Sequence, residues 1–198
     1  MTVARPYHHG NLREALLQAG EDALETGGVQ GLSLRELARE AGVSHAAPRR
    51  HFPDRQALLD ALAESGFARL EAALAEAVSA AGPDFAARLA GLGRAYIAFA
   101  TARPALTGLM FTAKHQDDAP PSLAAAADHA FAPAITAVAE GQTAGEVVDG
   151  DPERIALIAS AALHGIVVMA GNGMIGDTPT DEMVDDVITR LVLGLRPR

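Results

Sequence analysis

Apolar side chains recur every three to four residues along almost the whole chain, and no segment of useful length alternates between apolar and polar residues. The first pattern places a stripe of apolar side chains along one face of a helix, whereas half-buried strands require the second. Only 4% of the residues are aromatic and alanine is the commonest residue, which also favours helices over sheets. The predicted fold class is therefore all-α.

Several classes of protein are excluded by composition. The 198 residues include no cysteine, which rules out a disulfide scaffold, a zinc ribbon, an iron–sulfur site and a thiol nucleophile. The first ten residues have no apolar core typical of a secretory signal. One stretch, residues 155–175, is apolar enough to resemble a membrane span, but it contains Ser160, His164 and Asn172. We expect a buried helix there, no membrane partner, and a cytoplasmic protein.

The net charge of −9 is unevenly distributed along the chain. Residues 1–55 carry seven Arg against seven Asp or Glu, a net charge of 0, whereas residues 56–198 carry nine basic and eighteen acidic side chains, a net charge of −9. We expect two domains with these bounds. The local cluster of basic residues near position 50 can meet phosphate although the remainder of the chain repels it.

The first domain has the pattern of a helix-turn-helix. A helix over residues 11–26 is ended by Gly27-Gly28, and Ser33 with Glu36 forms a capping-box pattern that opens a second helix to about Ala41. Gly42 breaks that helix, and a third short helical segment ends near Phe52. Three short helices with a glycine turn between the second and third are typical of this DNA-binding motif.

The second domain is predicted to consist of longer helices. Asp54 and Asp151 are placed as N-caps, and Pro133 is expected to bend the helix that contains it. The helix after Asp151 is apolar nearly all round, which predicts burial on more than one side. The predicted helices run over residues 54–82, 83–103, 105–111, 122–139, 152–171 and 180–195.

Residues 31–62 closely resemble the DNA-binding domain of TetR-type transcriptional regulators. Residues 7–16 resemble a subgroup whose ligand-binding domain is named for a Trp-His-Gly motif, and Ala162-Leu163-His164-Gly165 is similar, with Leu163 in place of the Trp. The resemblance implies an N-terminal helix-turn-helix and a larger C-terminal helical domain that binds an effector and dimerises. It also implies a ligand-responsive regulator, most often a repressor, that binds operator DNA.

On that basis the third helical segment enters the major groove, with its first side chains near base edges. Pro48 and Arg49 stand where most relatives have an apolar residue and a Tyr. Because proline lacks an N–H and disfavours helical geometry at the residue before it, we expect Ser44 to Ala47 to form an irregular lead-in to a helix that begins at Pro48. The side chains expected near base edges are Ser44, His45, Ala46 and Arg49, and of these Arg49 is expected to contact phosphate rather than a base. The other expected phosphate contacts are Arg50, His51, Arg55 and Arg35.

The C-terminal domain is expected to hold the effector site and the dimer seam. The candidate ligand residues are Tyr96, Phe99, Met110, Phe111, Phe131, His164 and Met169, although simple core packing is an equal interpretation of each. His164 is a candidate for either the pocket or the seam. Residues 86–111 carry only Arg88, Arg94 and Arg103 as charged side chains, which favours a hydrophobic or weakly anionic effector. The candidate seam residues are Ile155, Ile158, Ala162, Ile166, Val187, Ile188, Leu191 and Leu195.

No cofactor, metal site or catalytic site is predicted. The histidines lack the spacing of a zinc helix, and His115 with Asp117 and Asp118 is better explained as a polar loop. No Gly-x-Ser-x-Gly motif and no phosphate-binding glycine loop occur. Two alternatives stay open: a helical small-molecule binding protein that has lost specific DNA binding, and an all-α enzyme that uses a cavity at His164.

Overall fold

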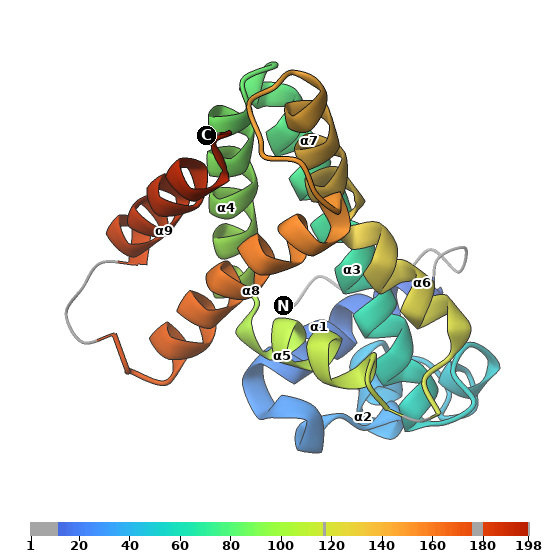
Figure 1. Ribbon diagram of the computed structural model, residues 1–198. Coiled ribbons are helices and arrows are strands. Elements are labelled where there is room, and N and C mark those ends of the chain that lie inside the picture. Colours follow the sequence, from blue (N-terminus) through green and yellow to red (C-terminus); the bar gives the residue numbers. More distant parts are fainter. Residues whose placement is uncertain (1–11, 117, 176–179, 198) are drawn as a thin grey trace. The chain divides into compact units, whose positions relative to one another are not determined.

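The computed structural model describes residues 12–116, 118–175 and 180–197 (Figure 1). Every regular element in this part of the chain is helical, which confirms the all-α prediction. In chain order the elements are α1 (Leu12–Gly31), α2 (Leu34–Glu40), the 3-10 turn η1 (Pro48–Arg50), α3 (Arg55–Ala81), α4 (Phe85–Ala102), α5 (Pro104–Ala113), α6 (Pro121–Ala130), α7 (Ala132–Thr143), α8 (Pro152–Gly171) and α9 (Thr180–Leu195).

The chain divides into two compact units. The first unit comprises residues 1–65 and 105–123, and the second comprises residues 66–104 and 124–198. The first unit thus combines the predicted helix-turn-helix with α5, a segment from the middle of the chain. The second unit contains α4, α7, α8 and α9 together with the later part of α3 and most of α6.

In the first unit, α1, α2 and η1 pack against one another around a small apolar core. Leu16, Leu37 and Phe52 are at most 1% exposed and supply much of this core. The carboxylate of Glu25 accepts hydrogen bonds from the first free N–H groups of α5, at 3.1 Å from Ala105 N and 2.9 Å from Leu106 N. An acidic group at a helix N-terminus satisfies donors that have no partner within the helix, so α1 and α5 are joined by more than apolar contact.

Most of the predicted helix ends are confirmed. The Asp54 Oδ1 atom accepts from Ala57 N at 2.9 Å, and the Asp151 Oδ1 atom accepts from Glu153 N at 3.0 Å. Gly28 and Gly42 have φ of 65° and 66°, a left-handed conformation that glycine adopts at little cost. Gly28 kinks α1 where the sequence predicts the first helix to end, and a short helical segment follows this kink to Gly31.

Two expectations about helix ends are wrong. Ser33 has the extended backbone of an N-cap, but its side chain makes no capping hydrogen bond, so the capping box with Glu36 does not form. The break predicted at Pro133 lies at Phe131, between α6 and α7. Pro133 instead occupies the first turn of α7, where its missing N–H has no intrahelical partner to lose.

In the second unit, α4 packs against α7, α8 and α9, and α8 also packs against α7 and α9 (Figure 1). The approach of α9 to α4 is close at Gly93, where a Cβ atom would lie 2.8 Å from the Cδ1 atom of Ile188. Arg94 Nη2 donates to Asp185 Oδ1 at 2.9 Å across the same pair of helices. Gly93 therefore leaves room for the Ile188 side chain between α4 and α9.

Within the single chain one face of α8 is buried, whereas its composition predicts burial on more than one side. Ala156, Ala159, Leu163 and Ile166 are buried and form this inward face. Leu157 and Ile158 are 68% and 58% exposed, and Val168 and Met169 also face outward. By length and composition α8 is the one single helix of the described chain that is apolar enough to cross a membrane, and the bent pair α6–α7 passes the same test together.

Candidate nucleic-acid interface and apolar cavity

The segment after α2 is a turn rather than a regular helix. Ala47 N donates to Ser44 O at 2.9 Å, and η1 begins at Pro48, where the sequence predicts the helical turn to start. The predicted loss of helical geometry before the proline is wrong, because Ala47 has φ of −63° and ψ of −46°. The Pro48 carbonyl accepts from both His51 N and Phe52 N at 2.9 Å. Pro48 is buried and Phe52 is 1% exposed, so these two side chains anchor the segment to the core.

Residues 49–51, between these anchors, and residues 44–46, before them, face solvent. Residues 41–53 contain no Asp or Glu, so no carboxylate of the segment itself neutralises its basic side chains. An exposed basic segment held by a buried proline and a buried phenylalanine can present cations and hydrogen-bonding groups to a nucleic acid. The exposed predicted DNA contacts are Arg35, Ser44, His45, Ala46, Arg49, Arg50 and His51.

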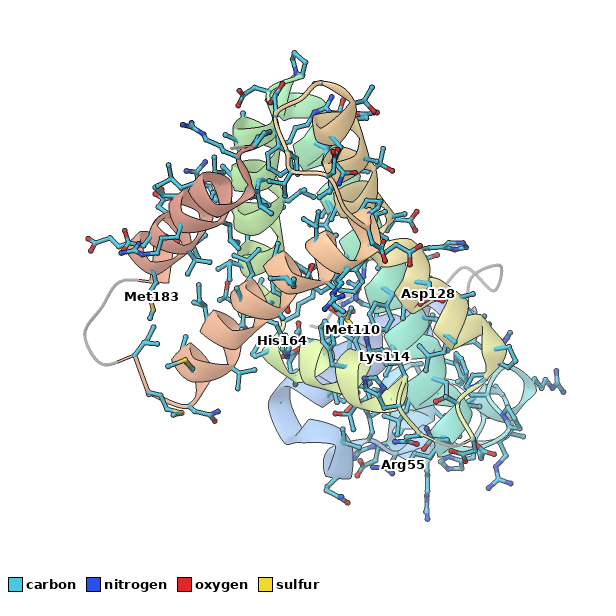
Figure 2. All side chains as sticks on the ribbon, viewed as in Figure 1. Arg55, Met110, Lys114, Asp128, His164 and Met183 are labelled. Carbon is cyan, nitrogen blue, oxygen red and sulfur yellow. The ribbon has the colours of Figure 1, made fainter. Side chains whose placement is uncertain are left out.

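Arg55, labelled in Figure 2, is half-buried, whereas the other predicted contacts are exposed. Its Nε atom donates to Leu32 O at 3.0 Å, and its Nη2 atom donates to Val29 O. These carbonyls belong to the end of α1 and to the link that follows it, where helical partners are missing. The guanidinium of Arg55 therefore joins the start of α3 to the end of α1, a structural role that was not predicted from the sequence.

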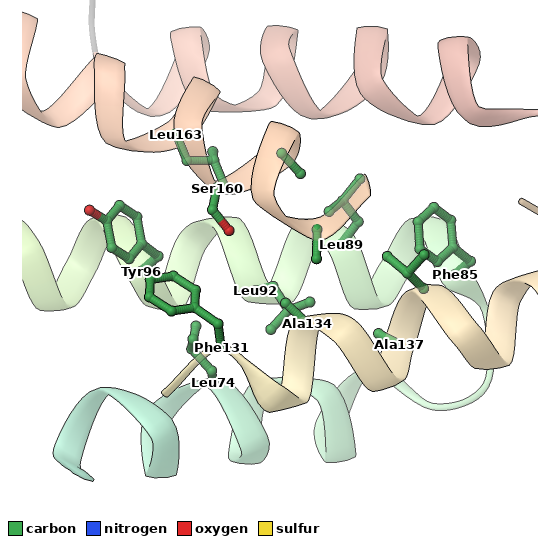
Figure 3. Close-up of a pocket in the computed structure, with 13 residues that line it drawn as sticks. Leu74, Phe85, Leu89, Leu92, Tyr96, Phe131, Ala134, Ala137, Ser160 and Leu163 are labelled. Atoms are coloured by element: carbon green, nitrogen blue, oxygen red, sulfur yellow. The ribbon is translucent and has the colours of Figure 1, made fainter. Parts of the chain in front are cut away.

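The second unit encloses an apolar cavity of about 40 Å³ (Figure 3). None of its lining residues is an Asp, Glu, Lys or Arg, and the side-chain oxygens among them are those of Tyr96 and Ser160. The lining comes from α3, α4, α7, α8 and the residue that separates α6 from α7. The lining residues are Leu74, Phe85, Leu89, Leu92, Tyr96, Phe131, Ala134, Ala137, Val138, Ala156, Ala159, Ser160 and Leu163.

A hydrogen bond lies at one end of this cavity. The Tyr96 hydroxyl of α4 is 2.6 Å from Nδ1 of His164 on α8, and the two ring centroids are 6.4 Å apart. Tyr96 is 5% exposed, and burial raises the pKa of its hydroxyl above the usual range because the phenolate loses solvation. The hydroxyl therefore stays protonated in the folded chain and serves as a polar group in apolar surroundings.

The structure brings some of the predicted ligand residues together and separates others. Tyr96 and Phe131 line the cavity. His164 does not line it and forms a hydrogen bond with the Tyr96 hydroxyl. Phe99 is buried without lining the cavity, and Met169 is 38% exposed. Met110 and Phe111 belong to α5 of the first unit. The aliphatic lining was missed because apolar periodicity alone does not distinguish a cavity wall from a solid core.

The predicted seam residues differ in burial. Ile158 is 58% exposed, and Ile155, Ala162, Val187, Leu191 and Leu195 are half-buried. Ile166 and Ile188 are 4% and 5% exposed, so their side chains pack within the chain and have little surface left for a partner. The outward stripe of α8 consists of Leu157, Ile158, Ala161, Ala162, Gly165, Val168 and Met169.

No group of three or more His, Asp or Glu side chains positioned to hold a metal ion occurs within the described ranges. The loop residue Asp117 and the N-terminal residues His8 and His9 lie outside the described residues.

Two family models match the chain. Residues 16–62 match the model of bacterial regulatory proteins of the tetR family, and residues 89–195 match the model of the Tetracyclin repressor-like C-terminal domain. The chain is 49% identical to a protein of unknown function from Rhodococcus sp. RHA1. The solved structure of that protein matches with a TM-score of 0.92 over 98% of this chain and 100% of that one.

Named relatives are more distant or match over shorter stretches. A TetR family transcription regulator from Marinobacter aquaeolei is 20% identical with a TM-score of 0.75, covering 94% of this chain and 96% of that one, which supports the fold. Tetracycline repressor protein class C of Escherichia coli is 43% identical over 27% of this chain and 24% of that protein. Nucleoid occlusion factor SlmA of Aliivibrio fischeri is 33% identical over 50% of this chain and 51% of that protein. The chain thus spans about a quarter and about half of the lengths of these two curated relatives.

Proposed function

Because this chain belongs to the TetR family of DNA-binding transcriptional regulators, we propose that it is a homodimeric repressor that leaves its operator when a small-molecule effector occupies the cavity of the second unit. Regulators of this family are typically not enzymes. We place the protein in the cytoplasm, where its operator DNA is. Membership of the subgroup with the Trp-His-Gly motif stays a prediction.

The observation that carries the DNA-binding part is the exposed segment that Pro48 and Phe52 anchor. Ser44, His45 and Ala46 offer hydrogen-bonding groups and a methyl surface to base edges in the major groove. Arg49, Arg50 and His51 lie in the same exposed segment and are suited to phosphate oxygens. Arg55 is left out of this set because its guanidinium already binds two backbone carbonyls.

The outward stripe of α8 supports the dimer. Leu157 and Ile158 are large apolar side chains in solvent, whereas Ala161 and Gly165 are small enough to let a second helix approach. Packing these large apolar side chains against a second copy removes them from water. This burial stabilises the dimer by about 25 cal/mol per Å² of apolar surface buried. We propose that α8 and the exposed side of α9, including Leu193, form a four-helix seam with a second copy.

The cavity supports the effector part of the proposal. Its helices include α8, whose other face carries the seam stripe, so a ligand that separates α7 from α8 also displaces the seam. Two half-sites on DNA must be met together, about one helical turn apart, and small displacements therefore reduce affinity.

Titration of DNA from the region beside the protein's own coding sequence tests the proposal. We expect tight binding of one segment and at least tenfold weaker binding of shuffled DNA of the same composition. The double variant Arg49→Ala/Arg50→Ala should lose most of this binding, whereas Arg154→Ala, an exposed arginine of α8, should keep it. Equal binding of specific and shuffled DNA would contradict the proposal and favour a helical ligand-binding protein without specific DNA binding.

A further inference from the structure

The lining of the cavity restricts the charge of its ligand. A charged group placed in apolar surroundings requires an oppositely charged partner or several hydrogen bonds. No charged side chain lines the cavity. The sequence favours a weakly anionic ligand partly because of two arginines of α4, but both of these side chains bind other groups of the protein. Arg88 binds Glu140 and the Gly82 carbonyl, and Arg94 binds Asp185. Neither an anion nor a cation would find a countercharge there.

The Tyr96–His164 pair can form a hydrogen bond with either a donor or an acceptor atom of a ligand. If the Tyr96 hydroxyl donates to Nδ1 of His164, its oxygen keeps lone pairs that accept from a ligand hydroxyl. If Nδ1 carries the proton and donates to Tyr96, the Tyr96 O–H is available to a ligand carbonyl. The tautomer of one histidine thus decides whether the phenol accepts or donates, and both arrangements keep the pair hydrogen-bonded.

The present cavity is too small for a typical ligand. A volume of about 40 Å³ has room for only a few water molecules, whereas ligand sites enclose roughly 300–1,000 Å³. Phe131 is the lining residue that belongs to no helix, since it separates α6 from α7. Its ring projects into the cavity near Tyr96 (Figure 3). Rotation of this ring would enlarge the space and leave every helix intact.

From these three observations we infer that the cavity takes an uncharged, largely apolar molecule that carries one hydroxyl or carbonyl oxygen, and that this oxygen binds the Tyr96–His164 pair. The inference rests on the proposed effector role of the cavity and names the class of effector. The conformation described is then the closed, unoccupied one, and the ligand displaces the Phe131 ring as it enters.

Methyl NMR of the full-length protein without DNA tests the inference. Ala134, Ala137, Ala156 and Ala159 line the cavity, so their methyl groups report occupancy directly. The probes are five compounds with one benzene ring: toluene, benzyl alcohol, acetophenone, benzoate and benzylammonium. We expect benzyl alcohol and acetophenone to shift these methyl signals with affinities roughly three- to tenfold above that of toluene, the gain from one net hydrogen bond. Benzoate and benzylammonium should not bind.

The Tyr96→Phe variant should bind toluene as the wild type does and lose the preference for the two oxygen-bearing probes. Thr101→Val removes a hydroxyl from the same helix, outside the cavity lining, and should retain the preference. The inference is overturned if benzoate or benzylammonium binds as well as acetophenone, if Tyr96→Phe keeps the preference, or if no probe shifts the alanine signals. Because DNA is absent, these results do not depend on operator binding. Operator release by charged compounds alone would contradict the inference and leave the regulator role intact.

Discussion

The Tyr96 hydroxyl lies 2.6 Å from Nδ1 of His164, and this hydrogen bond links α4 to α8 at the end of a cavity without charged lining residues. The two residues are 68 positions apart in the sequence. Their bond satisfies a polar group that burial would otherwise leave without a partner, and it gives His164 one fixed neighbour. Whether His164 serves the ligand pocket or the dimer seam stays a prediction.

Ionisation of Tyr96 should lower stability at alkaline pH. Burial raises the pKa of the Tyr96 hydroxyl in the folded chain, so the unfolded chain loses this proton first, at about pH 10. The contribution of the protonated Tyr96 hydroxyl to the free energy of unfolding is therefore fully present below pH 10. Above pH 10 it falls by up to about 1.4 kcal/mol per pH unit. Urea unfolding at a series of pH values should show a shallower alkaline loss in Tyr96→Phe than in the wild type. If the free energy of unfolding fell equally with pH in both proteins, ionisation of Tyr96 would not be the cause of the alkaline loss of stability.

Arg49 should contribute to DNA affinity without reading sequence. Its exposed guanidinium follows buried Pro48, and we expect it to contact phosphate. Arg49→Ala should weaken binding to all sequences alike and reduce the slope of log K against log[salt] by about one unit. A loss of roughly 1–3 kcal/mol confined to one base pair would instead show that Arg49 reads a guanine.

Arg55 should contribute to the stability of the folded chain and should not affect the salt dependence of DNA binding. Its guanidinium donates to the Val29 and Leu32 carbonyls, and hydrogen bonds from a charged donor contribute about 1.5–3 kcal/mol each. Arg55→Ala should lower the free energy of unfolding by about 1–3 kcal/mol, while Arg49→Ala should leave it nearly unchanged. The salt slope of Arg55→Ala, measured where the variant is folded, should equal that of the wild type. A slope reduced by one unit would restore Arg55 to the phosphate contacts.

Ile158 should be central to the dimer. Its side chain is 58% exposed in the single chain, so replacing it with a charged residue does not disturb the core. Ile158→Arg should convert the dimer to a folded monomer in light scattering and abolish specific DNA binding at the same time. Thr136→Arg, at an exposed position of α7, is the matched control and should remain dimeric. A dimer that survives Ile158→Arg would place the seam elsewhere.

Features fixed by a few neighbouring residues could be predicted from the sequence. Asp54 and Asp151 cap their helices because a short carboxylate reaches an N–H two or three residues ahead. Gly42 supplies a left-handed turn, and the 3-10 turn η1 begins at Pro48. Ser33 has the same cap signal, yet its side chain makes no capping bond, so the pattern specified where α2 begins and not how it is capped.

Features that depend on distant residues could not be predicted in this way. Neither the pairing of Tyr96 with His164 nor the contact of Arg55 with Val29 follows from spacing, because each joins separate elements. Ile188 was assigned to the seam because it shares an apolar face of α9, but Gly93 of α4 allows it to pack inside the chain. A helix pattern identifies an apolar face without specifying which neighbour covers it.

Selection of random-sequence DNA by the purified protein tests the central claim most directly. We predict enrichment of one sequence with two inverted half-sites about one helical turn apart, bound by a dimer. The double variant Arg49→Ala/Arg50→Ala should enrich nothing under the same conditions. Recovery of no common sequence by the wild-type protein, or of a single half-site bound by a monomer, would contradict the account.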